Sequence, residues 1–159
     1  MKKSKQAFTM IELIFVIVII GILAVVAIPR LSVTRDDAKI SKLSHQLQTL
    51  KTEIATSIFA KGKVPKNKNS IEEASNTVRE LEKSGDLIIQ DESGKVNIFL
   101  VNKDDSNKEH CKKMVLDYNN SSKVELYIQS ENGSTAICKG IDTLVQDINM
   151  TIAGNRVGY

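Results

Sequence analysis

Hydrophobic side chains are concentrated near the start of the chain. Residues 13–28 contain no charged side chain, and extending this run back to residue 8 adds only two polar residues, Thr9 and Glu12. At 1.5 Å per residue, a helix over residues 8–28 is about 31 Å long, which is roughly the thickness of the hydrocarbon core of a bilayer. Because a helix is the only single segment that satisfies its own backbone in lipid, the pattern predicts a transmembrane helix.

Beyond Pro29 the chain becomes polar, yet its apolar residues keep a helical spacing. They recur three or four positions apart, at Ile40, Leu43, Leu47, Leu50, Ile54 and Ile58. Such spacing places them on one face of a helix. We therefore predict a single helix of about fifty residues, apolar all round in its first half and amphipathic over residues 29–60, which ends at Gly62 and Pro65.

Two residues weaken this helix. Pro29 removes a backbone hydrogen bond and predicts a bend, and Gly21 is a second flexible point. Both residues are common and tolerated in membrane helices. The alternative is that residues 21–29 bend or unwind when the segment leaves the bilayer, and the sequence does not decide between the two interpretations.

The rest of the chain predicts a small α+β domain. Ser70 to Glu73 has the pattern of a capping box that starts a short helix, which Gly85 ends. Short runs with strand character follow, separated by turn signals. The expected strands are Leu87–Ile89, Val96–Val101, Met114–Tyr118, Val124–Ile128 and Thr135–Cys138. An antiparallel sheet with one buried face would cover the apolar stripe of the long helix.

The charge is distributed unevenly over the 159 residues. The net charge of +3 comes from Lys2, Lys3 and Lys5, because residues 8–159 hold equal numbers of basic and acidic side chains. A neutral domain argues against bulk electrostatic binding of nucleic acid. Lysines before an apolar helix also place the N-terminus in the cytoplasm and the later residues outside.

Four further lysines lie in one predicted loop over residues 61–69. They are Lys61, Lys63, Lys66 and Lys68. The plain interpretation is a solvated loop, and the alternative is a local contact with DNA or with anionic lipid head groups.

The N-terminal segment resembles the start of type IV pilins and of the pseudopilins of type II secretion and DNA-uptake systems. The matching elements are a short basic leader, the sequence FTMIEL at residues 8–13, Gly21, and Pro29 at the end of the apolar run. The resemblance covers about a fifth of the chain. It implies that a membrane aspartic peptidase cuts between Ala7 and Phe8 and methylates the new amine of Phe8. Alanine stands at position 7, where the family usually has glycine, so cutting is expected to be slower.

Glu12 is the unusual residue of the apolar run, because a carboxylate is unfavourable in hydrocarbon unless it has a partner. Cutting would expose a cationic amine at Phe8, and the two charges attract strongly in an apolar medium. We expect the partner to be the amine of a neighbouring subunit shifted along the filament axis, which would make Glu12 set the stagger between subunits. The alternative is a glutamate that reaches the membrane interface.

Cys111 and Cys138 both lie beyond the membrane segment. Two cysteines in an oxidising compartment predict one disulfide. A metal site is not expected, because His110 stands beside Cys111 but the other histidine, His45, is far along the chain. Two unpaired thiols are the remaining alternative.

Calcium binding is not expected either, since Asp142 and Asp147 are isolated and lack a dense set of oxygen ligands. We expect no cofactor. No nucleophile motif or phosphate-binding loop is present, so the sequence does not favour an enzyme.

These observations together predict a prepilin-like structural subunit. A leader (1–7) would precede a filament-core helix (8–28), its amphipathic continuation (29–60) and a periplasmic domain (61–159). Expected partners are the peptidase, other copies, minor pilins, an ATP-driven assembly platform and inner-membrane lipid. One alternative is a minor pilin that binds DNA or a secreted substrate. The other is a soluble secreted protein, cut after Ala27 by an ordinary signal peptidase.

Overall fold

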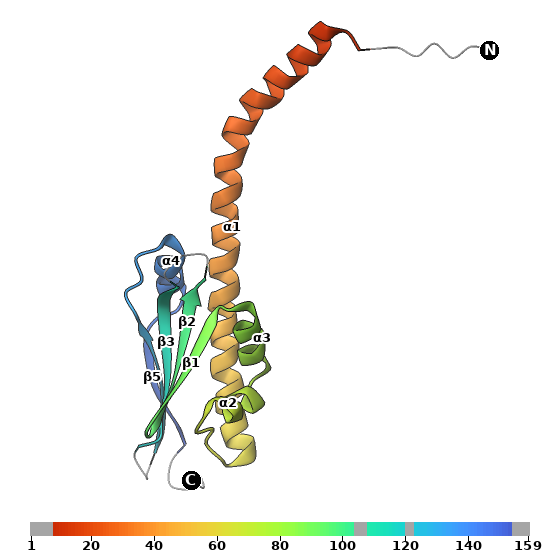
Figure 1. Cartoon of the computed structure of the whole chain (residues 1–159). Helices are drawn as coiled ribbons and strands as arrows, with labels where there is room; N and C mark the ends of the chain where they lie inside the picture. Colours follow the sequence, from red (N-terminus) through yellow and green to blue (C-terminus); the bar gives the residue numbers. More distant parts are fainter. Residues whose placement is uncertain (1–7, 104–107, 120–122, 154–159) are drawn as a thin grey trace, which may run out of the picture. The chain divides into compact units, whose positions relative to one another are not determined.

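A computed structural model describes residues 8–103, 108–119 and 123–153, although it does not describe the side chains of residues 28–33 and 153. The chain divides into two compact units, residues 1–36 and residues 37–159. Helix α1 (Met10–Lys61) is 52 residues long and contributes to both units (Figure 1).

In the first unit, α1 stays helical through Gly21 and Pro29. The predicted long helix and its end just before Gly62 are therefore confirmed. The bend predicted at Pro29 stays a prediction. The segment Met10–Ala27 is long and apolar enough to cross a membrane, judged by length and composition.

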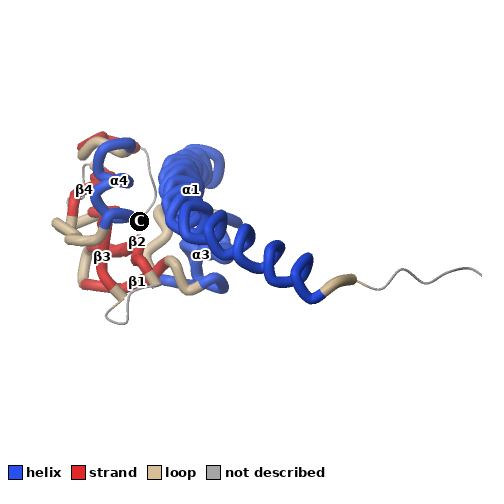
Figure 2. The backbone as a smooth tube through the Cα atoms, turned by 90° about the horizontal axis from the view of Figure 1, so that it is seen from above, coloured by secondary structure: helices blue, strands red, loops and turns tan. Residues whose placement is uncertain are grey.

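The second unit is built on a five-stranded antiparallel sheet, whose strands lie side by side in chain order. The strands are β1 (Leu87–Glu92), β2 (Lys95–Asn102), β3 (Glu109–Asp117), β4 (Val124–Ser130) and β5 (Ile148–Ala153). The sheet packs against the second half of α1, and Figure 2 shows its strands on one side of that helix. The predicted α+β fold is confirmed.

The core lies between this helix and the sheet because both supply an apolar face with the expected period. Leu50, Ile54 and Ile58 of α1 are completely buried, as predicted from their spacing. They share one hydrophobic cluster with Val96, Ile98 and Leu100 of β2. At about 25 cal/mol per Å² of apolar surface removed from water, this burial is the main stabilising contribution to the unit.

The region predicted as one helix after Ser70 is in fact two helices. Helix α2 (Lys68–Ala74) starts earlier than predicted, because Asn67 is its N-cap and forms the capping box with Ser70. The predicted box between Ser70 and Glu73 is therefore wrong. An asparagine side chain competes well for the N-cap position, since its oxygen accepts a backbone N–H as readily as a serine hydroxyl does.

Helix α3 (Asn76–Ser84) begins directly after α2. Ser75 has an extended backbone and its hydroxyl oxygen accepts the N–H of Val78, which ends one helix and caps the next. Glu53 of α1 holds this junction by accepting hydrogen bonds from the Ser75 hydroxyl and the Thr77 N–H. The predicted end at Gly85 is confirmed, and its φ of 78° is a conformation that favours glycine.

The last two elements differ most from the prediction. Four predicted strands lie in β1 to β4, but residues 135–138, predicted as a strand, start helix α4 (Ala136–Leu144). The reason is that the Thr135 side chain caps this helix by accepting the N–H of Cys138 at 3.3 Å. Strand β5 is absent from the prediction, although Ile148, Met150 and Ile152 alternate with polar or small residues as in a half-buried strand.

Candidate processing and assembly site

The start of α1 is fixed by a reciprocal pair of residues. Thr9 precedes the first helical residue, and both its backbone N–H and its hydroxyl donate hydrogen bonds to Oε2 of Glu12, each at 2.8 Å. The N–H of Glu12 in turn lies 3.3 Å from the Thr9 hydroxyl oxygen. This is a capping box, which satisfies backbone donors that a helix otherwise leaves unpaired at its first turn.

The pairing adds partners that the sequence analysis did not name, because the helix of Glu12 itself supplies two donors to the carboxylate. The expected pairing with the amine of a neighbouring subunit stays a prediction. The sequence contains the signal for this, because Thr-x-x-Glu before an apolar run is the capping-box pattern. A negative charge in the first turn is also favoured by the helix dipole.

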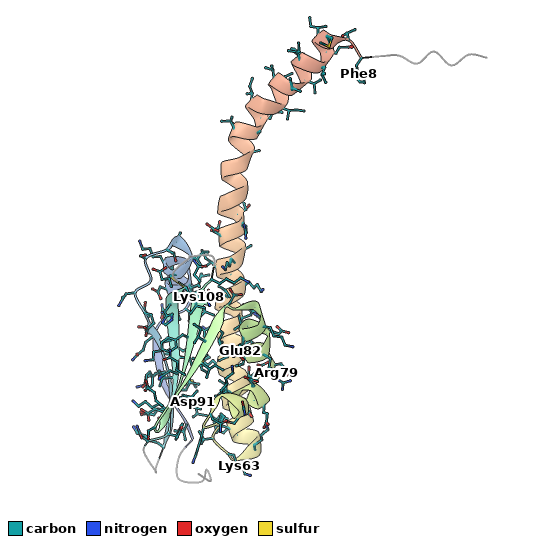
Figure 3. All side chains as sticks on the ribbon, viewed as in Figure 1. Phe8, Lys63, Arg79, Glu82, Asp91 and Lys108 are labelled. Atoms are coloured by element: carbon teal, nitrogen blue, oxygen red, sulfur yellow. A yellow bond between two sulfur atoms is a disulfide. The ribbon has the colours of Figure 1, made fainter. Side chains whose placement is uncertain are left out.

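The apolar side chains that follow are almost all exposed. Phe8 is 86% exposed, Ile11 76% and Phe15 66%, and the whole Met10–Ala27 segment buries nothing against the rest of the chain. Figure 3 shows side chains projecting from this part of α1 on all sides, with Phe8 at its start. An apolar surface of this length requires lipid or other protein chains to cover it.

Comparison with known families identifies this segment. The model for the prokaryotic N-terminal methylation motif matches residues 2–28. The chain carries the methylation motif of the type IV pilin and pseudopilin class. The methylation motif implies a prepilin that is processed by prepilin peptidase. Together with the apolar helix it suggests an anchor in the inner membrane, and it suggests a structural rather than enzymatic protein. No curated protein and no solved structure matches the chain.

The structure describes most of the residues that were predicted to act in the methylation motif. Ala7, on the leader side of the predicted cut, lies outside the described residues, whereas Phe8 is described and exposed. A Cβ added at Gly21 would meet no atom of the described residues within 4 Å, so none of these residues requires glycine there. Pro29 lies within α1. Cutting, methylation and the assembly roles of Glu12, Gly21 and Pro29 stay predictions.

The lysines of the predicted basic loop are not equivalent. Lys68 forms ion pairs with Glu72 at 3.8 Å and with Glu82 of α3, and hydrogen bonding to Glu82 raises the pKa of its ammonium group. The ammonium of Lys66 lies 5.7 Å from the centre of the Tyr118 ring. Lys61 and Lys63 are exposed. Since carboxylates of the domain already offset Lys68, the loop presents less unbalanced charge than its sequence suggests.

Both cysteines belong to the second unit. Cys111 of β3 and Cys138 of α4 are both buried and form a disulfide bond, with their Cα atoms 4.6 Å apart. Neither is a free thiol, and the described residues contain no group of three or more His, Cys, Asp or Glu side chains that could hold a metal ion. His110 instead stacks on Phe99, with ring centres 4.7 Å apart.

Two charged residues of β3 that the sequence did not single out also hold the last elements. Glu109 accepts hydrogen bonds from Ser134 and Thr135 at the start of α4. Lys112, although 2% exposed, pairs with Asp142 at 2.8 Å and Asp147 at 2.7 Å. These are the two aspartates at which calcium binding was not expected, and in the structure both pair with the Lys112 ammonium group.

Proposed function

We propose that the chain is a structural subunit of a helical filament of the type IV pilus, type II secretion or DNA-uptake class. The observation that carries this proposal is the methylation motif joined to an exposed apolar helix. In the proposed route, the peptidase cuts between Ala7 and Phe8 on the cytoplasmic side and methylates Phe8. The apolar segment of residues 8–28 then passes from lipid into the filament core.

The subunit would be divided into a leader (1–7), a filament-core segment (8–28), an amphipathic continuation (29–60) and a domain in the periplasm (61–159). In this arrangement the sheet domain covers the filament surface, which suits a neutral domain with a polar exterior. An ATP-driven assembly platform would supply the work that moves the apolar segment out of the membrane.

Glu12 is proposed to pair with the Phe8 amine of a neighbouring copy and so to set the stagger between subunits. Such a pair is strong in an apolar core, because little water screens it. The retained glutamate also argues against the tip subunit of such filaments, which often lacks it.

The test compares Glu12→Ala with the parent chain in cells that contain the peptidase and assembly machinery. Mass spectrometry should find a mature N-terminus at methylated Phe8 in both. Membrane insertion should be unchanged, while filaments and cross-links between copies should be lost in the variant. Normal filaments from Glu12→Ala, or a mature chain that begins at Met1 or after Ala27, would contradict the proposal.

The alternative of a DNA-binding minor pilin has weaker support. It depended on four lysines in one loop, and one of these, Lys68, is paired with Glu72 and Glu82. We therefore do not adopt it.

A further inference from the structure

The contacts of Glu12 are unequal at its two oxygens. Oε2 accepts two hydrogen bonds at 2.8 Å from Thr9, one from the backbone N–H and one from the hydroxyl. Among the described residues, no donor contacts Oε1. The carboxylate is therefore held in one orientation by its own helix and keeps one oxygen available for a partner from outside the chain.

This arrangement changes the energetics of a glutamate in an apolar segment. A buried carboxylate without donors is strongly disfavoured, and hydrogen bonds to the charged form are the interactions that offset the loss of water. Thr9 supplies two of them before any second subunit arrives. It also supplies them at the helix N-terminus, where the dipole favours a negative charge.

The capping box does not depend on the leader. All of its donor and acceptor atoms belong to residues 9–12, on the C-terminal side of the predicted cut between Ala7 and Phe8. The N–H of Thr9 remains a peptide N–H after cutting, because Phe8 still precedes it. The same contacts can therefore exist in the precursor and in the mature subunit.

We propose that Thr9 is a positioning residue for filament assembly, which satisfies Glu12 within the membrane-held subunit and holds Oε1 ready for the cationic amine of another copy. This inference rests on the proposed function. Preorganisation of this kind favours association because the orientation of the carboxylate is fixed before the subunits meet.

The hydroxyl is the group to change, since the backbone N–H remains in every variant. Thr9→Val keeps the branched shape but removes the hydroxyl, whereas Thr9→Ser keeps the hydroxyl and removes a methyl group. In the full chain expressed with its peptidase and assembly machinery, Thr9→Ser should assemble like the parent. Thr9→Val should give about fivefold fewer cross-links between copies, the factor expected when one helix-cap hydrogen bond is lost. Cross-links are counted only among subunits that have been cut before Phe8, which mass spectrometry identifies.

A second measurement follows the capping box without assembly. Amide hydrogen exchange of residues 9–12 is measured in the precursor in lipid nanodiscs, so that a variant which resists cutting is still informative. Exchange at the N–H of residue 12 should be faster in Thr9→Val than in the parent and in Thr9→Ser, because the hydroxyl oxygen that accepts this N–H is lost. Exchange at the N–H of residue 9 should be faster in Glu12→Ala, because its carboxylate acceptor is lost.

The outcomes separate this inference from the proposed function. If Glu12→Ala abolishes filaments while Thr9→Val assembles and exchanges like the parent, the filament proposal stands and the role of Thr9 is refuted. If Glu12→Ala assembles normally, the filament role of Glu12 fails whatever Thr9 does. Equal defects in Thr9→Ser and Thr9→Val would also refute the inference, because the hydroxyl would then not be the relevant group.

Discussion

Glu109 shows how one side chain fixes the start of a helix from a neighbouring strand. Its carboxylate lies at the first position of β3 and accepts hydrogen bonds at the N-terminus of α4. Hydrogen bonds from the Thr135 hydroxyl and then from Ser134 hold the pKa of Glu109 at about 2, well below its usual value. A depressed pKa means that the folded state favours the charged form, so this carboxylate stabilises the domain only while it is ionised.

Because the pKa of Glu109 is lower in the folded state, the stability of the domain depends on pH. The contribution of Glu109 is complete above pH 4.5, the ordinary pKa of a glutamate, and is lost as the pH falls towards 2. Glu109→Gln should therefore lower the Tm at pH 7, and the difference from the parent should shrink between pH 4.5 and pH 2. Thermal unfolding followed by circular dichroism measures this, with the exposed Glu131→Gln as a control that changes little. A difference that stays constant down to pH 2 would contradict the prediction.

At the scale of elements, β3 holds the C-terminal part of the chain by three kinds of contact. Glu109 accepts hydrogen bonds from Ser134 and Thr135 just before α4, and the disulfide of Cys111 joins α4 covalently. Lys112 pairs with Asp142 of α4 and with Asp147 just before β5. Burial alone would lower the pKa of Lys112, but hydrogen bonds to Asp142 and Asp147 outweigh it and raise the pKa above its usual value. The ammonium is therefore charged at neutral pH.

Replacing this ammonium should weaken the attachment of α4 and β5. Lys112→Met keeps most of the apolar stem and leaves two carboxylates without their cation, and both are partly exposed to water. We expect a loss of about 2 kcal/mol, less than for a fully buried pair because water can solvate the aspartates. Urea unfolding measures it. Asp147→Asn is the matched control and should cost less, since Asp142 remains. A Lys112→Met variant as stable as the parent would show that the pair contributes nothing net.

These elements also show where sequence patterns suffice. The long helix was predictable because its apolar stripe repeats over many turns, and the alternation in β2 identified a half-buried strand. Helix α4 was not predictable in this way, because residues 135–138 are β-branched or small and its N-cap residue, Thr135, is held by Glu109, 26 positions away. The Thr9–Glu12 contact was visible as a local pattern, whereas the pairing of Lys112 depends on residues up to 35 positions away.

At the scale of the molecule, the boundary between the two units at residue 36 makes a prediction about fragments. A fragment of residues 37–159 keeps the buried stripe of α1, including Leu43 and Ile58, together with the whole sheet. It should be soluble without detergent and unfold in one cooperative transition. A fragment of residues 62–159 lacks that stripe and should not fold, because one face of the sheet loses its cover. Chemical denaturation of both fragments tests this, and cooperative unfolding of the shorter one would contradict it.

Helix α1 also has a mechanical consequence. No described residue between Met10 and Lys61 leaves the helix, and its last turns form the core of the second unit. The proposed filament route therefore has a consequence for residues 37–61, which belong both to α1 and to the core of the second unit. A pull on this part of the helix loads the helix–sheet interface, so the strength of that interface sets an upper limit on the force that the folded domain can bear.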